Sequence, residues 1–179
     1  FFRTMAAAAV SFVLLNAASV RATAQSDPSQ NFRTADSCNT CHNNLKTAKG
    51  EDVSIGVEWR ASIMANAARD PYWQGSVRRE TLEHPESSTA IQSDCATCHM
   101  PLQRLQDKQQ SHDTDVFKRL PLSANHEGSA AAADGVTCAV CHQIQATGLG
   151  TPATYSGNLA VAPAGVPPRQ IGRAACRGR

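Results

Sequence analysis

Three segments of this sequence carry the same arrangement of reactive residues, Cys-x-x-Cys-His, at positions 38–42, 95–99 and 138–142. They contain six of the seven cysteines and three of the six histidines. On one turn of helix, residues i, i+3 and i+4 share a face, so the two thiols and the imidazole of each segment would point to the same side. This spacing is the attachment pattern of c-type haem, in which two thioethers hold one porphyrin edge and the histidine ligates the iron. We therefore predict three covalently attached c-type haems. The thioether residues would be Cys38, Cys41, Cys95, Cys98, Cys138 and Cys141, and the proximal iron ligands would be His42, His99 and His142.

We call these segments the first, second and third motifs. Three other uses of their cysteines compete with haem attachment. Structural zinc also uses Cys-x-x-Cys pairs, but a zinc ribbon normally pairs two of them to reach four ligands. A thioredoxin-like redox motif would explain one pair rather than three, and the βαβ pattern expected around it is missing. Disulfides suit an exported protein but give the repeated histidines no role. Covalent haem is the reading that uses all nine residues.

The second ligand of each iron decides between electron transfer and catalysis, because an iron with one protein ligand stays open to small molecules. Three histidines remain outside the motifs, so complete bis-histidine ligation is arithmetically allowed. Met64 is an alternative ligand, although a methionine on a helix face with Trp59 and Ile63 more often fills space in a core. Met/His ligation would raise the reduction potential. The candidate distal ligands are His84, His112 and His126, with Met64 as the alternative.

The composition indicates that something other than side chains fills the core. From residue 25 onward, only 23 of 155 residues are Leu, Ile, Val or Phe. This is below the roughly 20% at which chains struggle to bury a core. The 17 Lys and Arg nearly balance the 15 Asp and Glu, so no broad basic field favours nucleic acid as a partner. Haem held by thioethers would supply the missing apolar volume.

The first residues predict export. Arg3 precedes an uncharged run over residues 4–20, and Ala22-Thr23-Ala24 supplies the small-x-small pattern of a signal peptidase site. We therefore expect residues 1–24 to be an N-terminally truncated signal peptide and the protein to be periplasmic or extracellular. A membrane contact is expected only if this leader is retained. Residues 169–179 form a basic tail that includes Cys176, a composition that a frameshift or assembly error would also give.

Between these ends, the expected fold is mainly α with extensive loops and little β structure, as one compact domain over residues 25–168. Helices are predicted over 54–69, over 71–83, from just after Ser87-Ser88 into the second motif, and within 124–140 before the third motif. Residues 103–115 are polar and are expected to be looped or loosely helical. No stretch shows the sustained alternation of a strand.

The chain resembles the multihaem c-type cytochromes, especially the branch related to the tetrahaem electron carrier of bacterial hydroxylamine oxidation. The resemblance covers roughly residues 36–157. It rests on the three motifs, on Trp59-x-x-Ser62-x-Met64-Ala65 with Ala68-Arg69-Asp70-Pro71, on Met100-Pro101, and on Asp134-Gly135-Val136-Thr137 before the third motif. In such proteins a histidine often stands where this chain has Met64 and serves as a distal ligand. They usually continue to further haems, which implies that this sequence is a fragment.

The leading functional prediction is an exported multihaem cytochrome that relays electrons between redox proteins. The alternative is a haem enzyme that reduces or oxidises a small nitrogen or sulfur compound at a five-coordinate iron. A third alternative is a zinc-binding interaction module.

Overall fold

The computed structural model of the chain describes residues 32–123, 126 and 128–165. The predicted signal peptide, the basic tail and Cys176 lie outside the described residues. Within the described part, the only β pairings are two isolated bridges, Lys46 with Asp52 and Ile144 with Val161. The prediction of a mainly α protein with extensive loops is confirmed. In this part of the chain, no helix has the length and apolar character needed to cross a membrane.

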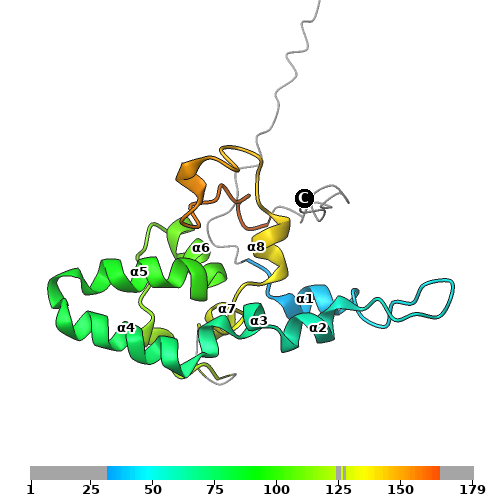
Figure 1. Ribbon diagram of the computed structural model, residues 1–179, viewed down its shortest axis with the longest axis horizontal. Coiled ribbons are helices and arrows are strands. Elements are labelled where there is room, and N and C mark those ends of the chain that lie inside the picture. The colour runs from blue at the N-terminus through cyan, green and yellow to red at the C-terminus, as the bar shows by residue number, and fades with distance from the viewer. Residues whose placement is uncertain (1–31, 124–125, 127, 166–179) are drawn as a thin grey trace, which may run out of the picture.

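Short helices make up the described structure (Figure 1). The α-helices are α1 (Ala35–Asn39), α2 (Ile55–Ala61), α3 (Ile63–Asn66), α4 (Pro71–Glu83), α5 (Ser88–His99), α6 (Pro101–Gln109), α7 (Ser129–Ala133) and α8 (Cys138–His142). Single-turn 3-10 helices lie between some of them, at Ala67–Arg69, Pro85–Ser87 and Phe117–Arg119, and another, Pro152–Thr154, follows α8.

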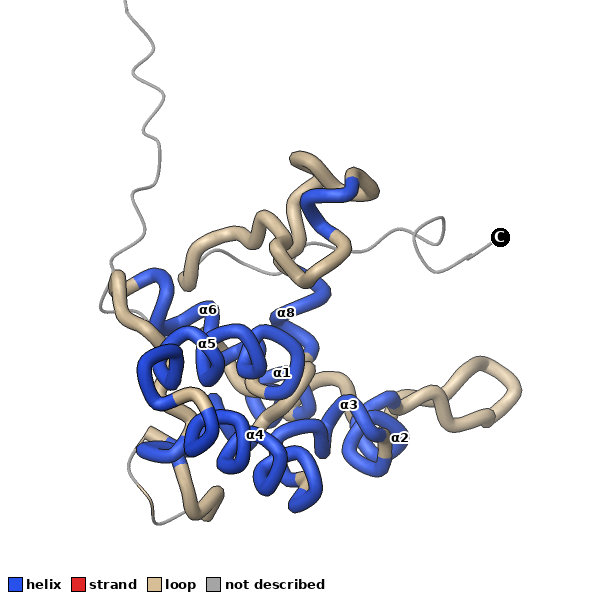
Figure 2. Tube along the Cα trace, turned by 60° about the vertical axis from the view of Figure 1, so that its left-hand side comes forward, coloured by secondary structure: helices blue, strands red, loops and turns tan. Residues whose placement is uncertain are grey.

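The helices fall into two groups that meet at α8 (Figures 1 and 2). Helices α4 and α5 form an antiparallel pair, and α6 packs on α5. Helices α1 and α2 lie toward the other end of the molecule, where the 43–53 loop projects outward, and α3 connects them to α4 through the Ala67–Arg69 turn. Helix α8 contacts α1 and also contacts α6. The third motif is therefore the junction between the other two.

The α4–α5 pair begins and ends where the sequence predicts. Asp70 caps α4, because its carboxylate oxygen Oδ1 accepts a hydrogen bond from the Tyr72 amide at 2.9 Å, and Pro71 occupies the first helical position. Helix α5 runs from Ser88 into the second motif, as expected. Helix α6 occupies much of the stretch that was expected to be looped or loosely helical. Helix α7 and the start of α8 confirm the predicted helical run before the third motif.

The prediction of a single helix over 54–69 is wrong, because the helix is interrupted at Ser62. This residue is extended (φ −77°, ψ 160°), so α2 ends before it and α3 begins after it. Its hydroxyl donates to the Trp59 carbonyl at 2.7 Å and accepts from the Ala65 amide at 3.3 Å. Serine competes with the helix for backbone partners in this way, which is why it favours caps over helix interiors.

The side-chain core is small and rich in alanine, as the composition predicts. One cluster packs around Trp73, Met100 and Val116, and the second packs around Phe32 and Leu102. Alanines fill much of the remaining buried apolar space in both clusters. Large apolar side chains remain at the surface, including Val57 (73% exposed), Ile63 (89%) and Tyr72 (84%).

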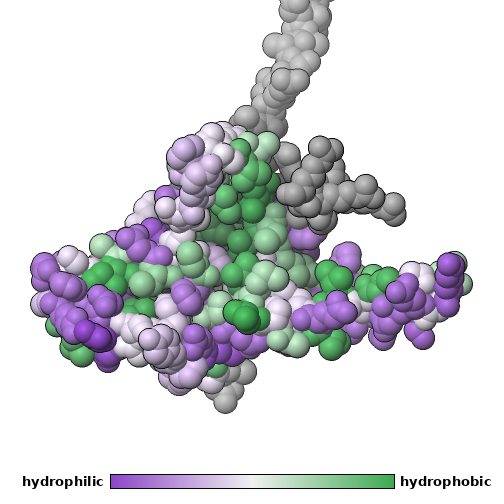
Figure 3. All heavy atoms as spheres, viewed as in Figure 1, coloured by the Kyte–Doolittle hydropathy of each residue, from purple (hydrophilic) through white to green (hydrophobic). Residues whose placement is uncertain are grey.

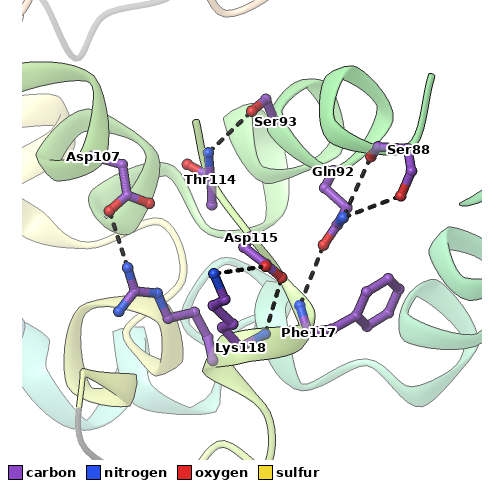
Figure 4. A network of polar contacts seen from close by, with 9 residues as sticks. Ser88, Gln92, Ser93, Asp107, Thr114, Asp115, Phe117 and Lys118 are labelled. Atoms are coloured by element: carbon purple, nitrogen blue, oxygen red, sulfur yellow. Dashed lines mark hydrogen bonds and ion pairs between the residues drawn. The ribbon is translucent and has the colours of Figure 1, made fainter. Parts of the chain in front are cut away.

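Polar contacts fix the 113–119 segment across α5 and α6 (Figure 4). The Thr114 amide donates to the Ser93 hydroxyl at 3.0 Å. At the other end of the segment, Arg119 forms an ion pair with the buried Asp107 of α6 at 3.1 Å. This segment thereby holds α5, which carries the second motif, in a fixed relation to α6.

Candidate functional site

All three motifs adopt helical turns, as their proposed chemistry requires. The second motif is the last turn of α5, and the third motif is α8 itself. Helix α1 ends inside the first motif, but the turn continues because the His42 amide donates to the Cys38 carbonyl at 2.9 Å. In each motif the first cysteine is half-buried and the second is exposed. The Cys41 and Cys98 thiols therefore remain accessible to a reagent from solvent, whereas burial raises the pKa of the Cys141 thiol above its ordinary value.

The first and third motifs are held together by a buried carboxylate. Asp134, which is 4% exposed, lies just before α8, and its Oδ2 accepts a hydrogen bond from the Ala35 amide at 2.7 Å. Ala35 is the first residue of α1, so Asp134 caps that helix from 99 positions away. A carboxylate at a helix N-terminus is favoured both by the free amides and by the helix dipole.

The two motifs share a cavity of about 270 Å3, which we call the 1–3 cavity. Thiols and imidazoles of both motifs line it. Arg33 lies at the same cavity, and Ile55 and Ala139 add apolar surface. The motif residues that line it are Cys38, Cys41, His42, Cys138 and His142.

The segment before the third motif docks onto the α2–α3 break. The Trp59 indole donates from Nε1 to the Val136 carbonyl at 2.9 Å, and the Val136 amide donates to the Met64 carbonyl at 2.9 Å. Gly135 adopts φ +60°, and a Cβ built there would lie 2.4 Å from the Met64 carbonyl oxygen. Only glycine fits this close approach. Helix α2 and the Gly135-Val136 segment are therefore packed together just before α8 begins.

A second cavity, of about 340 Å3, lies between the second and third motifs, and we call it the 2–3 cavity. Cys98 and Cys141 both line it, one from each motif. The arm formed by residues 144–161 makes one wall, and its Gly157 lies so close to α5 that a Cβ would be 2.8 Å from Thr97 Cγ2. Figure 3 shows apolar side chains gathered in a hollow beside α8, between this arm and the helical body. The apolar residues of the cavity are Pro101, Leu105, Val136, Val140, Ile144, Leu159 and Val161.

The imidazole of the second motif is oriented by two contacts. His99 stacks on Trp73 with ring centroids 4.4 Å apart and planes within 7° of parallel. Its Nδ1 lies 3.0 Å from the Ala67 carbonyl oxygen, so this nitrogen carries the proton and donates it to the carbonyl. Such a bond fixes the tautomer that leaves Nε2 with a lone pair, as metal-ligating histidines require.

The environments of the motif thiols differ. Burial raises the pKa of the Cys138 thiol above its ordinary value, and the neighbouring Cys38 thiol raises it further. Burial also raises the pKa of the Cys95 thiol, with a smaller effect from the Asp94 carboxylate.

We expect these two thiols to react slowly in the reduced, haem-free chain. The thiolate is the nucleophile, so a raised pKa lowers the reactive fraction at pH 8. Iodoacetamide should therefore label Cys95 and Cys138 later than the exposed Cys41 and Cys98, as measured by peptide mass spectrometry over time. Equal labelling rates at all four positions would contradict the described burial. The same time course in urea serves as the control, because unfolding should remove the differences.

The candidate distal ligands are scattered. His84 follows α4 and His112 follows α6, both exposed, and neither lines the 1–3 or the 2–3 cavity. His126 lines a third, polar cavity of about 500 Å3, together with Arg60, Asp36 and Asp134. Of the three histidines, His126 is the one that lines a described cavity, and that cavity also includes Asp36 of α1, the helix that ends inside the first motif.

Packing does not explain Met64, so the role favoured by the sequence pattern is wrong. The residue is 52% exposed, and its backbone carbonyl accepts a hydrogen bond from the Val136 amide of the third-motif segment. Met64 is exposed because the helix is interrupted at Ser62. This interruption ends the continuous helix face that Trp59, Ile63 and Met64 were expected to share.

Sequence reasoning missed Trp73 and the cavity-lining Arg33, Arg104 and Lys108, and it named Asp134 only within the stretch that carries the resemblance, without a role. Arg104 and Lys108 left a signal in their i,i+4 spacing, which places both on one face of a helix. The others depend on contacts between distant parts of the chain.

The motif cysteines and histidines do not converge on a point. Among the described residues, the one group of three or more His, Cys, Asp or Glu side chains close enough to hold an ion is Glu80, Glu83 and His84, on the exposed end of α4. Comparison with known proteins adds no assignment, because no family model, curated protein or solved structure matches this chain.

Proposed function

We propose that this chain is an exported multihaem c-type cytochrome that carries three covalent haems and relays electrons between redox proteins. The observation that supports it most strongly is the arrangement of three Cys-x-x-Cys-His turns around two cavities with apolar walls and cations on the lining. Haem has the matching chemistry, since its body is apolar and one of its edges carries two carboxylates.

The residues fit the group in three respects. The thiols of each motif are spaced for two thioethers on one helical turn. The Nδ1 contact of His99 leaves Nε2 to ligate iron. The shortage of large apolar side chains, with alanine at many core positions, leaves room for a cofactor to serve as core.

When bound, haem supplies reversible one-electron transfer, and the protein sets its potential through ligands, burial and nearby charge. This chain would contribute Cys38, Cys41 and His42 to one haem, and the second and third motifs to the other two. The third motif lies against α1 and α6, so it would hold its haem on a helix that contacts elements from both ends of the molecule. Electrons could then pass from one end of the molecule to the other.

A spread-out ligand set supports haem over zinc. Zinc needs four ligand atoms at about 2.0–2.3 Å from one point. Within the described residues, the thiols and imidazoles line a 270 Å3 space instead of closing on an ion. A zinc module also predicts a colourless protein that loses its metal to chelators.

One observation favours the haem enzyme as the second candidate. His84 and His112 are exposed and lie away from both cavities, so at least one iron could lack a second protein ligand. Such an iron would accept a small nitrogen or sulfur compound.

Electron paramagnetic resonance of the matured ferric protein separates these functions. An electron carrier with saturated irons should show low-spin signals only, and the reduced protein should not bind carbon monoxide. A high-spin signal together with carbon monoxide binding to one iron would contradict the electron-carrier proposal and favour the enzyme. The variant His126→Ala tests the candidate ligand that shares a cavity with Asp36 of α1, and His112→Ala is its matched control. Loss of a low-spin signal only in the first variant is expected if His126 ligates iron.

A further inference from the structure

The first cysteines of the first and third motifs are neighbours in the 1–3 cavity. Cys38 and Cys138 both line this cavity, and both residues are half-buried. The Cys38 thiol lies close enough to Cys138 to act on it both as a charge and as a hydrogen-bonding group. The second cysteine of the third motif, Cys141, lines the 2–3 cavity instead. The thiol beside Cys138 therefore belongs to a different motif.

The fold fixes the relative position of the two helices that carry these thiols. Helix α1 contacts α8, and the buried Asp134 carboxylate accepts the hydrogen bond from the Ala35 amide at 2.7 Å. Ala35 lies three positions before Cys38, and Asp134 lies four positions before Cys138. This hydrogen bond therefore anchors both segments close to their thiols. A disulfide requires such placement, because its geometry tolerates little movement of the backbone.

We propose that oxidation of the haem-free chain joins Cys38 to Cys138 in a disulfide between the first and third motifs. The oxidant is a small disulfide, for which oxidised glutathione serves as the probe. One cysteine attacks a sulfur of the oxidant as its thiolate and displaces one glutathione thiolate. The other cysteine then attacks the mixed disulfide and displaces the remaining glutathione. The two protein thiols lose two electrons and two protons in total, and the oxidant becomes two thiols.

This bond would make haem attachment depend on the thiol redox state. It takes one thioether sulfur from each of two motifs, so neither motif could hold haem through both of its cysteines until the bond is reduced. The second motif does not line the 1–3 cavity and would remain available. Only this consequence rests on the proposed function, because the cross-link itself is a property of the polypeptide.

Cys98 and Cys141 are the matched control pair. They also come from two motifs and line one cavity, but burial alone raises the pKa of the Cys141 thiol, without an effect of Cys98. Sharing a cavity is therefore distinguished from direct contact between thiols.

The test uses the full-length chain produced without haem attachment, in two variants that each retain one pair and carry serine at every other cysteine. Each variant is equilibrated in glutathione buffers of increasing reduced fraction and alkylated, and the oxidised fraction is read from the intact mass. We expect the equilibrium constant for disulfide formation to be at least about tenfold larger for Cys38–Cys138, because a neighbouring thiol has a higher effective concentration. The same measurement in urea should abolish this preference, since unfolding separates α1 from α8.

Peptide mapping of the oxidised wild-type chain provides a second measurement. Trypsin should release the peptide 34–46 linked to the peptide 120–169, with the bond between Cys38 and Cys138. An equal or smaller equilibrium constant for Cys38–Cys138 than for the control pair would overturn the inference, as would a map that contains only links within motifs. Failure of the proposed function is seen separately, because a protein that never acquires haem would leave both measurements unchanged.

Discussion

Serine at both Cys138 and Cys141 is expected to reduce the covalent haem content of the matured protein from three to two. These thiols are the only attachment points of the third motif, and serine forms no thioether. The change should also lower the free energy of unfolding, because α8 contacts both α1 and α6 and its residues line both cavities. Intact mass spectrometry under denaturing conditions measures the haem count directly.

Cys176→Ser is the matched control for this variant. It removes the one cysteine that lies outside the motifs, so the protein should keep three haems. A three-haem mass for Cys138→Ser/Cys141→Ser would show that these thiols do not attach haem. The same substitution in the first motif, Cys38→Ser/Cys41→Ser, should also remove one haem. It should leave the 2–3 cavity intact, because neither Cys38 nor Cys41 lines that cavity.

Gly135→Ala is expected to cause the largest loss of stability among single substitutions in the α2–α3 region. The left-handed backbone costs a non-glycine residue roughly 1–2 kcal/mol. Its Cβ would lie 2.4 Å from the Met64 carbonyl oxygen and 2.9 Å from the Ala65 carbonyl oxygen. Relief would require movement of the backbone, with an overpacking cost of about 1–3 kcal/mol. The combined cost of about 2–5 kcal/mol is a large share of the 5–15 kcal/mol that is typical of a domain.

Urea unfolding of the matured protein, followed by far-ultraviolet circular dichroism, measures this effect. Gly75→Ala is the control, because Gly75 lies inside α4 and a Cβ there meets nothing within 4 Å. It should raise the free energy of unfolding by roughly 0.5–1 kcal/mol, since alanine is the better helix former. Equal midpoints for the two variants would contradict the described docking of the third-motif segment on α3.

The two variants together would distinguish the effect of haem attachment from the effect of the contacts that hold the segment before α8 in place. Gly135→Ala leaves every motif residue in place, so haem should still attach when the chain is matured at low temperature. Cys138→Ser/Cys141→Ser leaves the docking contacts of Val136 in place.

Local signals in the sequence predicted the helices that local chemistry controls. Asp70 and Pro71 determine the start of α4, and the boundary before α5 follows from Pro85 and the serines after it. The predicted helix over 54–69 failed for a local reason that pattern counting overlooks: the hydroxyl of Ser62 takes backbone partners and breaks the helix.

The parts of the site that the sequence did not predict depend on contacts between distant residues. The bond from the Ala35 amide to Asp134 spans 99 positions, and neither residue carries a signal for the other. The close approach of Gly135 to Met64 likewise joins segments that only the fold brings together. The helical turn of each motif was predictable, because the spacing that indicates it is confined to five consecutive positions.

The most direct test of the central proposal is the mass and visible spectrum of the unaltered protein, exported from a host that attaches c-type haem. Three covalent haem masses, with a Soret band and an α band that sharpen on reduction, are the expected result. A colourless protein with the mass of the polypeptide alone, obtained from a host in which a known c-type cytochrome matures normally, would contradict the proposal.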